Sequence, residues 1–270
     1  MVAACAESWS LELDAPFEPA HISLVVPARL RDGSEAVLKI NFPEAESEHE
    51  PDALAWWSGA GAVRLLARDD ERRALLLEPC DPGTALWEVE DGEATGIAAA
   101  VLGRLWQKPA PGAPFRRLEP EALRWADELP AQWEAAGRPF ERTLVDEAVV
   151  FMQEAANDPG KPVLLHQDLH GGNILRSGRD EWLAIDPKPL VGEREFDTAS
   201  LLRDRRWELA SEPRAGRIVA RRLDQLADVL GLDRERMRGW GIAHALAWAY
   251  EGATFLPEHV VAARAIASVR

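Results

Sequence analysis

The sequence predicts an α+β fold of two lobes, a smaller β-rich lobe at the N-terminus and a larger helical lobe after it. Two observations predict this class. Residues 1–80 contain short apolar segments, alternating or β-branched and separated by turns, as strands do. From residue 81 onward, apolar residues mostly recur three and four positions apart, as in amphipathic helices. A chain of 270 residues that is 47% hydrophobic can bury a core of this size.

Strands account for most of the first forty residues. Residues 8–13 alternate between apolar and polar side chains, and residues 22–26 are apolar and partly β-branched. A turn at residues 31–34 joins this second segment to residues 36–40, which complete a hairpin. The sequence therefore predicts β-structure throughout this region.

A helix and two more strands complete the smaller lobe. The charged segment 43–50 leads into a helix that contains Trp56 and Trp57, and the glycines just after them end it. Residues 63–66 and 74–77 have the apolar character of strands. This part of the chain therefore predicts a sheet with one helix packed against it.

The boundary between the lobes is expected in the Pro/Gly-rich segment 78–83, which assigns residues 1–80 to the N-terminal lobe and 81–270 to the C-terminal lobe. Helical spacing then marks residues 94–107, 120–136, 141–156, 196–207, 214–230 and 234–255. A loop is expected at 109–114. Residues 163–186 are strand-like and rich in glycine, and they interrupt the helices.

The charge of the chain disfavours some classes of partner. The formal net charge is −15 and the pI is about 4.9. Such a surface repels phosphate backbones, so nucleic acid is not an expected partner. It attracts cations such as Mg²⁺ and polyamine-like molecules, although a solvated surface that keeps the protein soluble is the simpler explanation of the charge alone.

The cysteines and the apolar segments point to the cytoplasm. Cys5 and Cys80 are far apart and cannot form a disulfide framework or a CxxC metal pair. The first residues lack the basic segment and apolar run of a signal peptide. No stretch approaches the ~18 apolar residues of a membrane span. We therefore expect a cytoplasmic protein without membrane contact, whose oligomeric state the sequence leaves open.

One segment gathers most of the polar chemistry. Asp168 and Asn173 lie in a Gly-containing loop with apolar residues on both sides, and Asp186 ends another apolar strand. A carboxylate and an amide are oxygen ligands of the kind that Mg²⁺ takes from proteins, while a second carboxylate remains free to accept a proton. This combination is what a Mg-nucleotide site requires.

The polar segment matches a known pattern. His-x-Asp-x-x-x-x-Asn at residues 166–173, followed by Ile185-Asp186, resembles the catalytic and metal-binding core shared by protein kinases and aminoglycoside phosphotransferases. Within that family, three segments are similar to the streptomycin 6-kinase and hydroxyurea-resistance kinase branch; they are residues 75–83, 184–189 and 192–203. The resemblance covers roughly residues 20–250. It implies a two-lobed protein-kinase-like fold that uses ATP and Mg²⁺.

The resemblance assigns roles in the catalytic loop. Asp168 would orient the acceptor hydroxyl and take its proton late in the transfer, while Asn173 and Asp186 would hold Mg²⁺. The family's histidine at the position of His166 is structural, and His170 is left open between a functional and a plain loop residue. Asp197 is expected to be structural too, because its place before a helix favours N-capping and the family's equivalent braces the catalytic loop.

The resemblance also names residues that face the nucleotide. Lys39, within Ala36–Ile40, resembles the family's third-strand lysine and would contact the nucleotide phosphates. Glu50 would pair with Lys39, since the segment that starts there fits the family's helix better than the rival positions Glu46 and Glu48. The backbone from Glu78 to Cys80 is expected to meet adenine.

Departures from the protein-kinase pattern favour the small-molecule branch. His21-Ile22-Ser23-Leu24 replaces a Gly-x-Gly-x-x-Gly loop, which leaves Ser23 as the expected small polar contact to phosphate. Asp186-Pro187-Lys188 replaces Asp-Phe-Gly, and no Ala-Pro-Glu segment follows it. We also expect that an N-terminal helix, frequent in the family, is missing.

Three functions are compared. The leading one is an ATP-dependent O-phosphotransferase for an aminoglycoside such as streptomycin, with hydroxyurea or an unknown small metabolite as the nearest rival acceptor. A nucleotide-binding pseudokinase is disfavoured, because such proteins usually lack at least one of the family's functional residues. Here all four are present: Lys39, Asp168, Asn173 and Asp186. A metal-dependent phosphohydrolase is disfavoured by the single catalytic carboxylate. The acceptor is expected to be cationic and to bind an acidic pocket of the C-terminal lobe.

Overall fold

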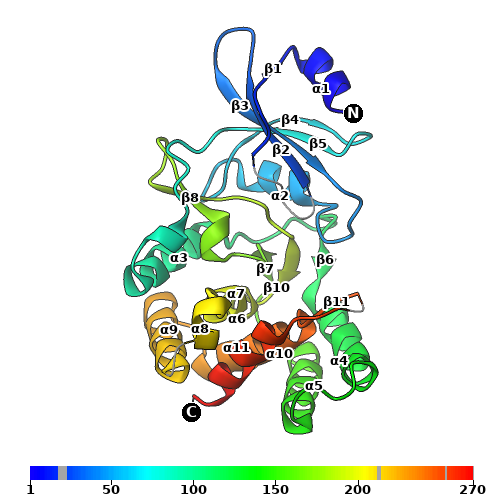
Figure 1. The fold of residues 1–270 in the computed structure, drawn as a ribbon, viewed down its shortest axis with the longest axis vertical. Coiled ribbons are helices and arrows are strands. Elements are labelled where there is room, and N and C mark those ends of the chain that lie inside the picture. The colour runs from blue at the N-terminus through cyan, green and yellow to red at the C-terminus, as the bar shows by residue number, and fades with distance from the viewer. Residues whose placement is uncertain (18–22, 212–213, 253, 270) are drawn as a thin grey trace.

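The computed structural model describes residues 1–17, 23–211, 214–252 and 254–269. An antiparallel sheet lies at one end of the molecule and most of the helices lie at the other, with short strands between them (Figure 1). The α+β architecture expected from the sequence is therefore confirmed. In the described part of the chain, every helix is too short or too polar to cross a lipid bilayer.

The N-terminal sheet has five antiparallel strands, in the order β1-β2-β3-β5-β4. They are β1 (Glu12–Leu13), β2 (Ser23–Arg29), β3 (Glu35–Asn41), β4 (Leu65–Asp69) and β5 (Ala74–Leu77). The predicted hairpin is present as β2 and β3, in register with Val25 opposite Lys39 and Ser23 opposite Asn41. Because side chains alternate along a strand, all four of these residues project from the same face of the sheet.

The N-terminal region differs from the prediction. It contains a helix, α1 (Val2–Trp9), whereas no N-terminal helix was expected. The strand expected at 8–13 shrinks to β1. Val2, Cys5 and Trp9 recur at three- and four-residue spacing and pack on one side of the sheet with Val26. The alternation at 8–13 was misleading because this helical spacing, which buries Cys5, starts earlier in the chain.

The helix α2 (Glu50–Trp57) lies beneath the sheet, on the side of the helical lobe (Figure 1). Leu54 and Trp57 are buried in the main core. The helix ends where predicted, since Ser58 and Gly59 both adopt positive φ, at 47° and 87°. This helix brings Glu50, its first residue, under β3.

The C-terminal lobe is largely helical, as expected. Its helices are α3 (Asp91–Leu105), α4 (Leu118–Ala135), α5 (Arg142–Asn157), α6 (Arg194–Asp197), α7 (Ala199–Leu202), α8 (Arg206–Ser211), α9 (Ala215–Leu230), α10 (Arg234–Ala247) and α11 (Pro257–Ala267), with a 3₁₀ turn η1 (Leu86–Glu88) before α3. The buried helix α10 contacts α5, α7 and α11.

Two helical predictions need correction. The single helix expected at 196–207 is divided among α6, α7 and α8, because turns near Thr198 and at Arg205, which has a φ of 53°, interrupt it. The helix expected at 234–255 ends at Ala247, and the strands β11 (Tyr250–Glu251) and β12 (Thr254–Phe255) follow it. The last helix, α11, begins at Pro257 and was not predicted.

Short strands between the two lobes carry the polar segment. They are β6 (Arg116–Arg117), β7 (Val163–Leu165), β8 (Ile174–Arg176), β9 (Trp182–Ala184) and β10 (Leu190–Gly192), and a 3₁₀ turn η2 (Gly171–Asn173) precedes β8. β7 pairs with β10, and β8 pairs with β9. Each pair is short and buried, so the loops that leave these strands have fixed starting points.

Candidate active site

The loop between β7 and β8 is held from below by one buried carboxylate. Asp197 accepts hydrogen bonds from the backbone N–H of His166 at 3.1 Å and of Gln167 at 2.7 Å, and from Trp106 Nε1 at 3.0 Å. Asp197 ends α6 and its side chain caps no helix in the described residues, so the capping expectation is wrong while its position supports the bracing expectation. Burial raises the pKa of Asp197 to about 6, although the three N–H donors oppose the shift.

His166 is buried beneath the loop and has a structural contact. Its Nε2 lies 2.9 Å from the carbonyl of Ile185, to which it donates, and its ring stacks against Trp57. Burial lowers the pKa of His166 to about 4, so the ring is neutral at physiological pH. The expected structural reading of His166 agrees with this geometry.

Asp168 lies at the surface of the loop with its side chain 18% exposed and is flanked by two cations. Its Oδ1 is 3.3 Å from Arg203 Nη2, and its Oδ2 is 4.0 Å from Lys188 Nζ. Neither cation was predicted as a partner. Glu46, from the other lobe, lies 3.5 Å from Lys188. The acidic acceptor pocket expected in the C-terminal lobe stays a prediction.

Two residues with side-chain oxygens that could bind a metal flank the paired strands β8 and β9. Asn173 directly precedes β8, and Asp186 lies two residues after β9. Asn173 uses its Nδ2 to donate to the carbonyl of Asp168 at 2.9 Å, which leaves its side-chain oxygen as an acceptor. The Asn173 carbonyl accepts from Ile185 N–H at 3.0 Å, so Asp186 follows directly beside it. Asp186 has a φ of 57°, an unusual conformation for a residue with a side chain, and such strain often occurs at functional sites.

The donor set fits a magnesium ion that is shared with a nucleotide. Mg²⁺ typically takes one or two carboxylates from a protein and completes its octahedron with phosphate oxygens and water. One carboxylate, Asp186, and one amide oxygen, Asn173, match that requirement. Among the described residues no group of three or more His, Cys, Asp or Glu side chains could hold a metal ion.

Lys39, Glu50 and Asp186 form a buried charge cluster that joins the two lobes. Lys39 Nζ lies 2.7 and 2.8 Å from the two carboxylate oxygens of Glu50 and 2.5 Å from Asp186 Oδ1. Asn41 also donates to Glu50 at 2.6 Å. Glu48 is exposed, so among the three candidate glutamates it is Glu50 that lies against Lys39.

Lys39 and Asp186 stabilise each other's charged forms, whereas burial, together with the like charge of Asp186, raises the pKa of Glu50 despite the opposing effect of Lys39. Burial alone would lower the pKa of Lys39, but Glu50 and Asp186 outweigh it and raise that pKa. Burial would raise the pKa of Asp186, but the charge and hydrogen bond of Lys39, helped by Lys188, lower it. The lysine is therefore a cation and Asp186 an anion at neutral pH, as binding of metal and phosphate requires.

The segment that joins the lobes has some backbone groups that are hydrogen-bonded within the protein and some that are not. The N–H of Glu78 donates a hydrogen bond to the carbonyl of Arg64 at 3.0 Å, and the Glu78 carboxylate forms an ion pair with Arg179 at 2.7 Å. Within the described residues, the Glu78 carbonyl and the Cys80 N–H have no protein partner, which leaves one acceptor and one donor for a ligand. Burial raises the pKa of the Cys80 thiol to about 11, so it stays protonated.

The expected phosphate-covering turn is only partly described. His21 and Ile22 lie outside the described residues. Ser23 is buried at the start of β2, opposite Asn41, and its side chain projects from the same face of the sheet as Lys39. This places Ser23 on the correct face of the sheet for the predicted contact.

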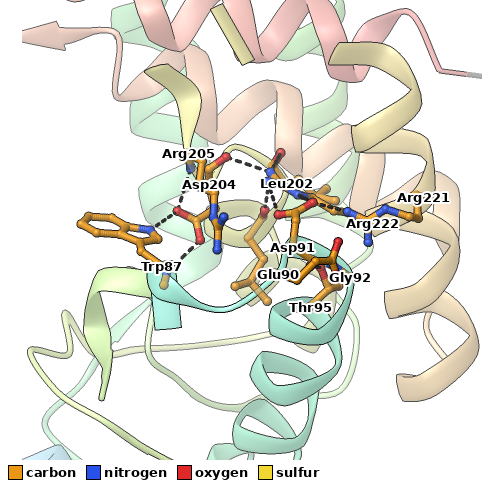
Figure 2. A network of polar contacts seen from close by, with 12 residues as sticks. Trp87, Glu90, Asp91, Gly92, Thr95, Leu202, Asp204, Arg205, Arg221 and Arg222 are labelled. Carbon is orange, nitrogen blue, oxygen red and sulfur yellow. Dashed lines mark hydrogen bonds and ion pairs between the residues drawn. The ribbon is translucent and has the colours of Figure 1, made fainter. Parts of the chain in front are cut away.

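A polar network beside the loop ties distant segments together (Figure 2). Asp204 accepts hydrogen bonds from Trp87 Nε1 at 2.7 Å and from the N–H of Gly171 at 2.8 Å. Arg222, from α9, donates to the carbonyl of Asp204 at 2.8 Å and pairs with Asp91 at 2.6 Å. These contacts fix the start of α3, the turn between α7 and α8, the helix α9 and η2 relative to one another. Sequence reasoning missed this network, because none of its pairs is close in sequence.

Trp87 also explains the glycines of the loop. Its ring stacks on His170 with centroids 5.1 Å apart. A Cβ added at Gly171 or Gly172 would lie 2.5 or 2.6 Å from the Trp87 side chain, so both positions require glycine. His170 Nδ1 accepts from Gly172 N–H at 3.0 Å, which makes His170 a residue that shapes the loop.

A lysine-bearing antiparallel sheet above a helical lobe, with an aspartate loop and a second aspartate between them, defines a kinase of the protein-kinase-like fold. The fold of a macrolide 2'-phosphotransferase from Brachybacterium faecium is similar, with a TM-score of 0.63 and 16% identity over 100% of this chain and 97% of that one. The family described as aminoglycoside/hydroxyurea antibiotic resistance kinase matches residues 8–256. The chain belongs to this family.

Relatives of known activity support the same assignment. A streptomycin 6-kinase from Streptomyces griseus is 38% identical over 99% of this chain and 88% of that protein. A hydroxyurea phosphotransferase from Kitasatospora aureofaciens is 39% identical over 97% of this chain and 76% of that protein. The chain is therefore a small-molecule kinase, and the predicted family is confirmed.

Proposed function

We propose that the protein transfers the γ-phosphoryl group of ATP to a hydroxyl group of an aminoglycoside such as streptomycin, with Asp168 as the catalytic carboxylate. The observation that carries this proposal is the placement of Asp168 at the surface of a braced loop, beside Lys188, which follows Asp186 of the Lys39–Glu50–Asp186 cluster by two residues. The four residues that turnover is expected to need are present: Lys39, Asp168, Asn173 and Asp186. A pseudokinase is disfavoured for this reason.

The acceptor side depends on Asp168. Its carboxylate would accept a hydrogen bond from the acceptor hydroxyl, orient the oxygen toward the γ-phosphorus and take the proton late in the transfer. A loose transition state asks mainly for positioning and charge stabilisation. The brace from Asp197 and the contact with Arg203 keep Asp168 in place, so the acceptor meets a preorganised group.

The nucleotide side depends on the cluster and on the segment between the lobes. The Glu78 carbonyl and Cys80 N–H match the donor and acceptor edge of adenine, Ser23 faces the phosphates, and Lys39 contacts them. Mg²⁺, held by Asp186 and Asn173, would neutralise charge on the phosphates when bound. For this contact Lys39 must share its ammonium between Glu50 and the nucleotide, in place of its present bond to Asp186.

Streptomycin and hydroxyurea are the two acceptors that the relatives suggest. The match to the Streptomyces griseus enzyme spans 88% of that enzyme. The match to the hydroxyurea phosphotransferase spans 76% of that protein, at nearly equal sequence identity. The acidity of the chain, −15 overall, favours the cationic streptomycin over neutral hydroxyurea.

The test is nucleotide consumption in the presence and absence of acceptors. Purified protein is incubated with Mg-ATP and with streptomycin, other aminoglycosides or hydroxyurea, while ADP formation is followed and products are identified by mass spectrometry. We expect ADP formation that depends on streptomycin and yields its phosphate ester. If hydroxyurea is the only compound that becomes phosphorylated, the acceptor is hydroxyurea and the assignment to streptomycin is wrong. Tight ATP binding without turnover on any acceptor would support a pseudokinase.

A further inference from the structure

Lys188 is placed with unusual rigidity for a lysine. The buried residues Pro187 and Pro189 flank it, each with a ring that fixes its backbone φ. The N–H of Lys188 donates to the carbonyl of His166 at 3.0 Å, which ties this segment to the catalytic loop. The side chain is only 14% exposed. The ammonium group is therefore confined to the space beside Asp168.

The ammonium of Lys188 lies among carboxylates but is saturated by none of them. It is 3.5 Å from Glu46 Oε2 and 4.0 Å from Asp168 Oδ2. Within the described residues it makes no hydrogen bond, although an ammonium has three donors. Two long ion pairs leave these donors available to a closer anionic partner.

The other cations of the site are already committed. Lys39 directs its ammonium at three carboxylate oxygens of Glu50 and Asp186. Arg203 is buried, donates to His244 Nδ1 at 3.0 Å and contacts Asp168. Lys188 thus differs from Lys39 and Arg203 in that its side chain makes no hydrogen bond within the described residues, and it follows Asp186 by two residues, between the proposed base and the proposed metal ligand.

We infer that Lys188 is a catalytic residue whose ammonium binds the phosphoryl group while it passes from nucleotide to acceptor, an inference that rests on the proposed phosphotransfer. In this step the acceptor oxygen bonds to the γ-phosphorus, and the bond from that phosphorus to the β–γ bridging oxygen breaks. ADP leaves with the electron pair, the acceptor proton passes to Asp168, and Lys188 keeps its proton. A fixed cation in a partly desolvated site stabilises such charge without reorganisation.

The first test is kinetic. We expect Lys188→Met to lower kcat by about 100-fold or more, the size of effect seen when one preorganised charge-stabilising group is removed. The KM for Mg-ATP should stay within a few-fold, and Lys188→Arg should restore part of kcat because it keeps the charge. Lys161→Met, at an exposed lysine of the same lobe, is the matched control and should behave like the wild-type protein.

A purely structural role makes a different prediction. If Lys188 served only to hold Glu46, then Glu46→Gln would break the same contact and cause the same loss of kcat. Under our inference, Glu46→Gln leaves kcat within a few-fold because the ammonium remains. Equal losses in Glu46→Gln and Lys188→Met would overturn the catalytic assignment.

A binding experiment separates this inference from the proposed function. Mg-ADP is titrated into the protein with and without aluminium fluoride, which mimics the transferring phosphoryl group, in a calorimeter. Wild-type protein should bind the fluoride complex more tightly than Mg-ADP, and Lys188→Met should lose most of that gain while its Mg-ADP affinity and thermal unfolding stay unchanged. A variant that keeps the gain refutes the role of Lys188. A wild-type protein without any gain, and without turnover on the acceptor panel, contradicts phosphotransfer itself and the inference with it.

Discussion

At the scale of single residues, Asp168, the proposed catalytic carboxylate, lies at the end of a buried chain of contacts. Asp168 contacts Arg203, whose Nε donates to His244, and His244 in turn stacks on Trp248 with ring centroids 4.0 Å apart. Each member restricts the rotamers of the next. A carboxylate held this way loses little conformational entropy when an acceptor binds, which is how positioning contributes to catalysis.

Replacing the carboxylate tests its role. Asp168→Ala should lower kcat by at least about 1,000-fold, because proton acceptance and acceptor orientation are lost together. The affinity for Mg-ATP should change by only a few-fold, since Asp168 faces the acceptor. Steady-state kinetics and nucleotide titration measure the two effects, and Asp127→Ala, at an exposed position of α4, serves as the control. A variant that keeps a tenth of wild-type turnover would contradict the assignment.

Short-range sequence signals indicate candidate site residues better than the partners of those residues. Asp168, Asn173 and Asp186 stand out in the sequence because the loop and strands that carry them are adjacent in the chain, and their roles stay predictions. Arg203 and Lys188 gave no such signal as partners of Asp168, because they approach it only through packing of α7 and of the segment after β9. The capping interpretation of Asp197 failed for the same reason, since its hydrogen-bond donors lie 30 and 31 residues away.

At the scale of elements, β3 and α2 act as one unit through the Lys39–Glu50 pair. Glu50 is fully buried and Lys39 nearly so. Removing one partner of such a pair leaves an uncompensated charge and is far more costly than removing a surface pair. The pair therefore fixes the position of α2 beneath the sheet as well as that of Lys39, which we propose faces the nucleotide.

The pairing can be checked with matched glutamate substitutions. Glu50→Gln should raise the KM for Mg-ATP and lower kcat, together by roughly tenfold or more in kcat/KM, because Lys39 loses the group that orients it. Lys39→Ala should show a larger effect in the same direction. Glu48→Gln, one helical turn or less away and exposed, should leave both constants unchanged. The pairing is wrong if Glu48→Gln reproduces the loss and Glu50→Gln does not.

Elements were predictable where local pattern and packing agree. The hairpin of β2 and β3, the helix α2 and the long helices α4, α5 and α9 carry strong periodicity and match the sequence reading. The helix α1 was missed because its apolar face is only three residues and depends on the sheet above it. The strands β11 and β12 separate α10 from α11, and they are rich enough in apolar residues that helical spacing alone extended the predicted helix to Phe255.

At the scale of the whole molecule, buried histidines should make the fold sensitive to acid. Burial lowers the pKa of His166 to about 4 and of His259 to about 3, and it lowers the pKa of His244 well below its ordinary value. The unfolded chain takes up protons at these residues below pH ~6.5, whereas the folded chain does not until far lower pH. The folded state is therefore destabilised progressively as the pH falls from about 6.5 toward 4. The raised pKa of Asp197, about 6, acts in the opposite direction and offsets part of the loss.

Urea unfolding at pH 7.5 and pH 5 measures this effect. Each buried histidine should cost roughly 2 kcal/mol at pH 5, so the free energy of unfolding should fall by a few kcal/mol in total. His259→Leu should reduce the difference between the two pH values, whereas His49→Gln, at a partly exposed histidine, should not. Equal stability at both pH values would show that these rings are not buried and neutral in the folded protein.

The net charge of −15 gives the last prediction, which concerns capture of the acceptor. A cationic acceptor is drawn toward the whole acidic surface, and salt screens this attraction with a Debye length of about 8 Å at physiological ionic strength. The ion-pair partners of Asp168 are the cations Lys188 and Arg203, so this prediction relies on the overall field and on acidic groups such as Glu46. The KM for streptomycin should therefore rise clearly between low and moderate salt, while the KM for Mg-ATP rises less or falls.

Hydroxyurea supplies the internal control, because a neutral acceptor feels no such field and its KM should not depend on salt. Glu46→Gln should weaken the salt dependence for streptomycin only slightly if the overall field dominates, and strongly if this one carboxylate guides the acceptor. Steady-state kinetics over a salt series on the active acceptor decides the matter. A cationic acceptor whose KM is indifferent to salt would leave the acidity of this chain as a property that keeps it in solution.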